Sequence, residues 1–232
     1  MDTHTKRRIW IVILVVLAVV LGVRAWYKLY REVPQPRWIT ADPRSDFLYG
    51  SIGTERSAGI PYWVWLVLPR ICKDEMPGEG GYAALSRPWE ETVEMPAGFA
   101  KKTVGYVRVA GNCALCHAAS LQPGPDEAPK VVVAPPGQAT NPAKLLAFFR
   151  QCAADPHFNA DEILSEIGMT TKLSLADQLL YRFVLIPRTR RALLGHRAVM
   201  IDAELRHHSE DPRAPFAGER RQALAAWLKT AR

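Results

Sequence analysis

The sequence predicts a mainly α-helical domain behind an N-terminal transmembrane helix, and three observations lead to this prediction. An uninterrupted apolar run covers residues 9–23 (IWIVILVVLAVVLGV). Amphipathic segments that begin at capping residues fill the second half of the chain. The stretches between them are rich in Pro and Gly, which is typical of irregular loops. With 232 residues, 48% of them hydrophobic, the chain is long enough to bury one substantial core.

The chain divides into three predicted parts. Residues 1–28 form a cytoplasmic tip and a transmembrane anchor, residues 29–47 a Pro- and Arg-rich linker, and residues 48–232 the folded domain. The net charge of +7 comes from basic residues that are spread along the chain. No nucleic-acid-binding motif accompanies them, so no nucleic-acid partner is expected. The basic residues fit either a solvated surface or docking to an acidic partner protein.

The apolar run is shorter than the roughly twenty residues that span a bilayer. It reaches that length over residues 9–27 if Arg24 snorkels and Trp26 and Tyr27 lie at the membrane interface. The alternative is a cleaved signal peptide with its cleavage site at residues 23–25. The bulky Trp26 and Tyr27 favour the uncleaved anchor. Both interpretations predict that the remaining chain is exported.

Residues 113–117 read CALCH, which matches the C-x-x-C-H attachment pattern of a c-type haem. Cys113 and Cys116 would each form a thioether with a vinyl group of the porphyrin, and His117 would be an axial ligand of the iron. A thioredoxin-like pair would need a strand–helix context, and a zinc half-site would need a second Cys or His pair. The motif instead lies between a Val- and Gly-rich run and a Gly- and Pro-rich loop, and no second pair follows it at finger-like distance. We therefore expect one covalently bound haem c.

Haem attachment also predicts an orientation, because c-type cytochromes receive their haem outside the cytoplasmic membrane. Basic residues flank the apolar run on both sides and hardly decide its direction. We expect a single-pass protein of the bacterial cytoplasmic membrane with its haem domain in the periplasm. The remaining cysteines, Cys72 and Cys152, either form a disulfide there or stay as two buried thiols.

Several stretches of the sequence carry a family resemblance. YGSIGTERSAGIPYWVWLVLPRI, GGYAAL and GFAKKTVGYVRVAGNCALCHAAS resemble the N-terminal part of the rubber-oxygenase-like dihaem c-type cytochromes, which are distantly similar to dihaem cytochrome c peroxidases. The similarity continues through CAADPHFNADEILSEI and LLYRFVLIP, and so covers most of the chain after residue 48. The resemblance implies a mostly helical, cytochrome c-like fold with haem at residues 113–117. Those proteins are longer and carry a second C-x-x-C-H, whereas this chain has one.

Before the motif, residues 60–69 (IPYWVWLVLP) predict a helix that is buried all round, with Pro61 in its first turn and Pro69 at its end. Residues 76–98 predict an irregular loop. Residues 104–109 predict a short strand or a helical approach to the motif. Residues 118–136 predict a loop or a short strand.

After the motif, the sequence predicts four or five helices. Asn141 and Pro142 open AKLLAFFRQCAA, Asn159 caps DEILSEI before Gly168, and Ser174 caps LADQLLYRFVLI, which is expected to end at Pro187. Residues 188–199 predict a basic, solvated face. Residues 219–230 predict an amphipathic helix that resembles the closing helix of small cytochromes c.

The sequence does not identify the second axial ligand of the iron. A methionine would suit electron transfer, whereas an open coordination position would suit peroxide or dioxygen chemistry. Met169, just past a capped helix, is the first candidate and Met200 the second, and either can also be a core methionine. Four histidines are further candidates or simply solvated side chains: His157, His196, His207 and His208.

These expectations define a leading function and its alternatives. The leading one is a membrane-anchored periplasmic mono-haem cytochrome c that transfers electrons to a redox partner protein, for which an acidic surface is one of the two alternatives that the basic residues allow. The alternatives are a haem-dependent peroxidase- or oxygenase-like enzyme, or the remnant of a dihaem enzyme.

Overall fold

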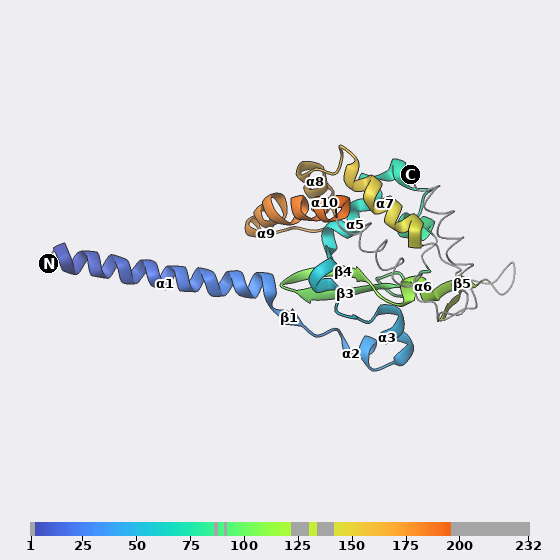
Figure 1. Ribbon diagram of the computed structural model, residues 1–232, viewed down its shortest axis with the longest axis horizontal. Coiled ribbons are helices and arrows are strands. Elements are labelled where there is room, and N and C mark those ends of the chain that lie inside the picture. Colours follow the sequence, from blue (N-terminus) through green and yellow to red (C-terminus); the bar gives the residue numbers. More distant parts are fainter. Residues whose placement is uncertain (1–2, 86–87, 91, 122–129, 134–141, 196–232) are drawn as a thin grey trace, which may run out of the picture.

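The computed structural model describes residues 3–85, 88–90, 92–121, 130–133 and 142–195. These residues are mostly helical (62%), as the sequence predicts, but they also contain antiparallel sheet. Figure 1 shows one long helix projecting from a body in which helices flank a small sheet. Helices α5 and α7 to α10 lie on one side of that sheet in this view, and α2 and α3 on the other.

The described helices are α1 (Thr3–Tyr30), α2 (Arg37–Thr40), α3 (Pro43–Tyr49), α4 (Glu55–Ala58), α5 (Tyr62–Ile71), η1 (Lys73–Glu75), η2 (Gly81–Leu85), α6 (Ala114–His117), α7 (Pro142–Ala154), α8 (Ala160–Thr170), α9 (Leu175–Leu180), the π-helix η3 (Tyr181–Leu185) and α10 (Ile186–Gly195). The described strands are β1 (Glu32–Val33), β2 (Ile60–Pro61), β3 (Phe99–Val104), β4 (Tyr106–Gly111), β5 (Ala118–Leu121) and β6 (Lys130–Val133). They form a four-stranded sheet in the order β1-β3-β4-β2 and a two-stranded sheet of β5 and β6.

Helix α1 is long and apolar enough to cross a membrane over Arg7–Tyr30: an 18-residue stretch of it has a mean hydropathy of 2.6, and none of that stretch is buried in the body. A signal sequence has the same properties. The helix joins the sheet directly, because β1 begins two residues after Tyr30 and pairs with β3. The hairpin turn at Gly105 contacts the chain just after α1. The N–H of Gly105 donates to the Arg31 carbonyl at 2.7 Å.

The segment predicted as a linker, residues 29–47, contains β1, α2 and the beginning of α3. Ile39 of α2 is buried in the core. The side chain of Gln35 donates to the carbonyls of Tyr49 and Lys101, each at 3.1 Å. These hydrogen bonds from a side chain to backbone carbonyls hold residues 29–47 against the sheet. The Pro content of the segment had instead predicted an extended linker.

Helix α5 lies in the middle of the core, as its apolar sequence predicts. Trp65 is 1% exposed and stacks on Tyr82 with ring centroids 4.2 Å apart. Its neighbours Trp63 and Leu66 are half-buried. Pro61 precedes the first turn, and the helix continues through Pro69 to Ile71 instead of ending there. Only Arg70 and Ile71 follow Pro69 in the helix. The Trp65 carbonyl, which Pro69 cannot reach with an N–H, accepts from the Tyr82 hydroxyl at 2.6 Å.

Residues 99–111 form a β-hairpin, whereas the sequence predicted only a short strand or helical approach over 104–109. Strands β3 and β4 pair from Phe99 opposite Gly111 to Val104 opposite Tyr106. The turn is at Gly105, whose φ of +75° suits glycine. The first strand contains two lysines and alternates poorly, so its pairing partner rather than its own pattern defines it.

Within residues 142–195, the predicted helices that follow the motif are present, with two changed C-terminal boundaries. Helix α7 buries Leu145, Phe148, Phe149 and Cys152 on one face. The Asn159 side chain accepts from the backbone N–H of Asp161 and Glu162 at 3.1 and 3.0 Å, as its capping role predicts. Helix α8 ends at Thr170, two residues after Gly168.

The helix capped by Ser174 does not end at Pro187, contrary to the prediction. It continues from α9 through η3 into α10. The N–H of Ile186 donates to the Tyr181 carbonyl, five residues back. This wider π-helical turn comes directly before Pro187. Because Pro187 has no N–H to donate, one backbone hydrogen bond is absent there, and the helix continues into α10 without it. The predicted helix over 219–230 lies outside the described residues.

Candidate functional site

The CALCH turn, residues 113–117, directly follows strand β4 and forms one helical turn. The Cys113 carbonyl accepts from the N–H groups of Cys116 and His117, each at 3.2 Å. Residues at positions i, i+3 and i+4 share one face of a helical turn. Cys113 and His117 are exposed, and Cys116 is half-buried. The structure therefore brings the three predicted attachment residues together on a face that solvent reaches.

The opposite face of the turn is packed against the body. Ala114 and Ala118 are each 1% exposed. Leu115 contacts the core, and a Cβ at Gly111 would lie 3.0 Å from its Cδ2. The turn is thus anchored through its small and apolar residues, while its thiols and imidazole are at the surface.

Asn112 fastens the CALCH turn to the end of α3. Its side chain is buried and donates to the carbonyls of Leu48 and Gly50 at 3.2 and 3.0 Å. Its Oδ1 accepts from the N–H of Ala114 at 3.0 Å. The sequence interpretation missed this residue, although an Asn directly before a helical turn is a recognised capping signal.

Gly98 lies directly beneath the CALCH turn, and sequence interpretation missed it as well. Its φ is +94°, and a Cβ there would lie 2.7 Å from the backbone nitrogen of Leu115. Its N–H donates to the Leu48 carbonyl at 3.0 Å, and its carbonyl accepts from the N–H of Asn112 at 3.0 Å. Gly98 thus joins α3, β3 and the turn at one point.

A charged cluster braces α3 against strand β6. Arg44 donates to Glu90 at 2.6 Å and to the Val131 carbonyl at 3.0 Å. The Tyr49 hydroxyl donates to the other oxygen of Glu90 at 2.7 Å. Burial raises the pKa of the Glu90 carboxyl, but the hydrogen bonds from Arg44 and Tyr49 outweigh it, so that its pKa lies below the ordinary value.

Met169, the first candidate for the second axial ligand, is not brought near His117. It lies in the last turn of α8 and is 71% exposed. Helices α8 and α6 lie apart in Figure 1. His157 pairs with Glu162 at 2.8 Å beside α8. The remaining candidates lie outside the described residues: Met200, His196, His207 and His208.

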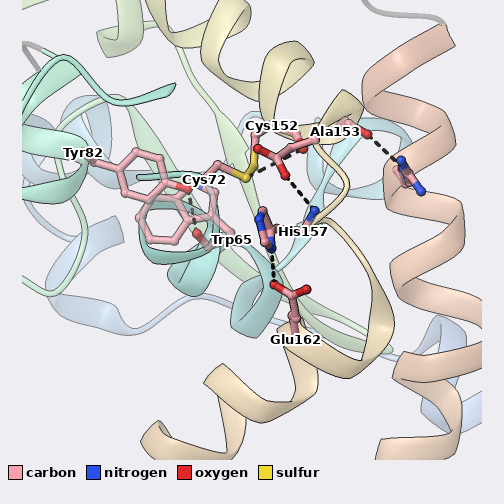
Figure 2. Close-up of a disulfide and its surroundings, with 9 residues drawn as sticks. Trp65, Cys72, Tyr82, Cys152, Ala153, His157 and Glu162 are labelled. Atoms are coloured by element: carbon pink, nitrogen blue, oxygen red, sulfur yellow. Dashed lines mark hydrogen bonds and ion pairs between the residues drawn. A yellow bond between two sulfur atoms is a disulfide. The ribbon is translucent and has the colours of Figure 1, made fainter. Parts of the chain in front are cut away.

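Cys72 and Cys152 form a disulfide, which decides between the two alternatives that the sequence leaves open. Figure 2 shows it between the end of α5 and the end of α7, next to Trp65 and His157. Both residues are buried, and their Cα atoms are 5.4 Å apart. Cys113 and Cys116 remain as thiols, the form that a thioether attachment requires.

The residues of the CALCH turn fit the predicted prosthetic group. Two thiols and one imidazole share an accessible face, which is the donor set that covalent haem attachment uses. No family model, curated protein or solved structure matches this chain. The function is therefore inferred from the motif, its geometry and its surroundings.

Proposed function

We propose that this chain is a membrane-anchored c-type cytochrome that holds one haem c and transfers electrons. The observation that supports the proposal best is the CALCH turn, which presents Cys113, Cys116 and His117 on one face. The chemistry of attachment needs these three groups at this spacing. The histidine directly after the second thiol makes the pattern far more specific than a C-x-x-C pair alone.

Each residue of the turn has a distinct task under this proposal. The thiols of Cys113 and Cys116 would hold the porphyrin, and an imidazole nitrogen of His117 would bind the iron. A bound haem supplies a one-electron redox centre. Asn112 and Gly98 would keep the turn in register with α3 and β3. The exposed position of the turn suits electron exchange with another protein, and the net charge of +7 favours an acidic one.

The resemblance to rubber-oxygenase-like dihaem cytochromes supports the same cofactor. It leads us to propose a cytochrome c-like haem domain, which this chain would build around an antiparallel sheet. A haem-dependent peroxidase or oxygenase, or the remnant of a dihaem enzyme, is the second candidate function. Met169 is exposed and lies apart from α6, so the first methionine candidate does not fill the second coordination position within the described residues. This favours the second candidate function, because an open position suits oxygen or peroxide chemistry.

We further propose that α1 stays uncleaved in the cytoplasmic membrane and that the body lies in the periplasm. The length and hydropathy of α1 support the anchor, and the attachment chemistry supports the outer side. A mature protein that starts at Met1 and leaves membranes only with detergent is the expected result. A mature protein that starts near residue 26 would instead identify α1 as a signal peptide.

The decisive experiment is to express the exported chain in a host with haem-attachment machinery and to test for haem after denaturation. The wild-type chain should retain haem, and Cys113→Ala/Cys116→Ala should lose it. His117→Ala should change the absorption spectrum, while His157→Ala, which alters another exposed histidine, should leave it unchanged. Wild-type protein without covalent haem would overturn the proposal.

The spectrum of the same preparation separates the two candidate functions. A low-spin spectrum with a methionine–iron band would support electron transfer. A high-spin spectrum that changes with peroxide or carbon monoxide would support the enzyme.

A further inference from the structure

The helix that runs from α9 through η3 into α10 has two unlike faces. Its inner face is buried in the core through Tyr181, Leu185 and Leu193. Its outer face begins with three large apolar side chains at intervals of four residues. These are Leu175, Leu179 and Phe183, which are 78%, 57% and 69% exposed. Three such residues in one row form a continuous apolar strip, here called the outer face of α9.

The outer face of α9 lies at the end of the body from which α1 projects. Figure 1 shows α9 beside the last turns of α1, at the opposite end of the body from α6 and β5. An ion pair between Lys28 of α1 and Asp177 of α9 fixes this proximity. Because β1 follows α1 almost at once and pairs with β3, the direction of α1 relative to the body is also set by the sheet.

The last turns of α1 carry the side chains that mark a membrane–water boundary. Trp26, Tyr27 and Tyr30 are 56%, 50% and 66% exposed. Trp and Tyr are enriched at the headgroup level of membranes. Since Lys28 lies among them and contacts Asp177, the start of α9 is at the same depth along the membrane normal. Lys172, just before α9, is exposed and adds a cation that anionic headgroups attract.

We propose that the outer face of α9 binds the lipid surface of the membrane that α1 crosses, with Leu175, Leu179 and Phe183 in the headgroup–acyl boundary. This inference rests on the proposed role of α1 as an uncleaved anchor. Large apolar side chains at this depth enter the headgroup–acyl boundary, as those of interfacial helices do. The contact holds the body in one orientation, in which the CALCH turn points away from the membrane and toward soluble partners.

Photo-crosslinking of the full chain in vesicles of phosphatidylethanolamine and phosphatidylglycerol tests this contact. The photoreactive residue p-benzoylphenylalanine replaces Phe183, or in a second variant Leu179, and lipid adducts are measured by mass. Trp26 serves as the position that the anchor places at the membrane. Leu121, which is 55% exposed at the other end of the body, serves as the matched apolar control. Adducts at Trp26, Phe183 and Leu179 should exceed those at Leu121 severalfold.

The outcomes separate this inference from the proposal on which it rests. Adducts at Trp26 without adducts at Phe183 and Leu179 would overturn the inference and leave the anchor standing. Adducts of these two positions to protein in place of lipid would overturn it too, because a second copy or another segment would then cover the outer face of α9. An absence of adducts at Trp26 would overturn the anchor and the inference with it.

Discussion

Gly98 and Leu115 lie in backbone contact, with the Cα of Leu115 only 2.5 Å from where a Cβ of residue 98 would be. The φ of Gly98, +94°, belongs to a region that L-residues with side chains rarely adopt. The first residue before β3 thus sets how closely the CALCH turn approaches the sheet. The CALCH turn can therefore pack this closely only because residue 98, fifteen positions before Cys113, is a glycine without a Cβ.

Gly98→Ala is expected to destabilise the protein and to impair haem attachment. The strained φ and the clash with Leu115 together should lower the free energy of unfolding by about 3 kcal/mol. Urea denaturation measures the loss, and haem content after denaturation measures attachment. Gly53→Ala is the matched control, because Gly53 has a φ of +91° with nothing within 4 Å of the added Cβ. Equal haem loss in both variants would contradict a specific role for Gly98.

Asn112→Ala should loosen the CALCH turn. It removes the donors to Leu48 and Gly50 and the acceptor for Ala114, at a cost of about 2 kcal/mol in unfolding free energy. Haem attachment should fall with it, because the thiols then lose their fixed positions. Asn159→Ala removes a helix cap of comparable strength at α8 and should leave haem attachment intact. Full haem content in Asn112→Ala would exclude the positioning role.

The Glu90 cluster predicts a loss of stability in acid. Since the folded-state pKa of Glu90 lies below its ordinary value, its contribution is fully present above that ordinary value and is lost as the pH falls through the folded-state pKa. Thermal unfolding between neutral pH and pH values below the ordinary glutamate pKa of 4.5 measures this slope. Glu90→Gln should make this slope shallower, because one of the carboxyls with a lowered pKa is then absent. An unchanged slope in Glu90→Gln would refute the assignment.

The disulfide should stabilise the protein through the long loop that it closes. Cys72 and Cys152 are 80 residues apart, and the CALCH turn lies inside that loop. Loop-closure entropy predicts that Cys72→Ala/Cys152→Ala lowers the free energy of unfolding by about 4 kcal/mol. Reductant should lower the urea midpoint of the wild-type chain and leave that of the double variant unchanged. A reductant-insensitive wild-type midpoint would argue against the bond.

Local signals accounted for the parts of the fold that the sequence predicted correctly. The apolar run of α1, the capping side chains of Asn159 and Ser174, and the buried pattern of α5 each act over a few neighbouring residues. The attachment motif is local in the same sense, because the chemistry of haem attachment depends on five consecutive residues. Pattern and composition therefore sufficed to predict a mostly helical chain and a haem-binding hypothesis.

Contacts between distant segments decided the rest. Strand β3 is defined by its partner β4, and the disulfide joins residues 80 positions apart. Asn112 and Gly98 support the CALCH turn only because both bond to Leu48 across the fold. The position of Met169 apart from α6, and that of α9 beside the end of α1, follow from helix packing and one ion pair. A residue pattern carries no distances between segments, so these relationships require the folded chain.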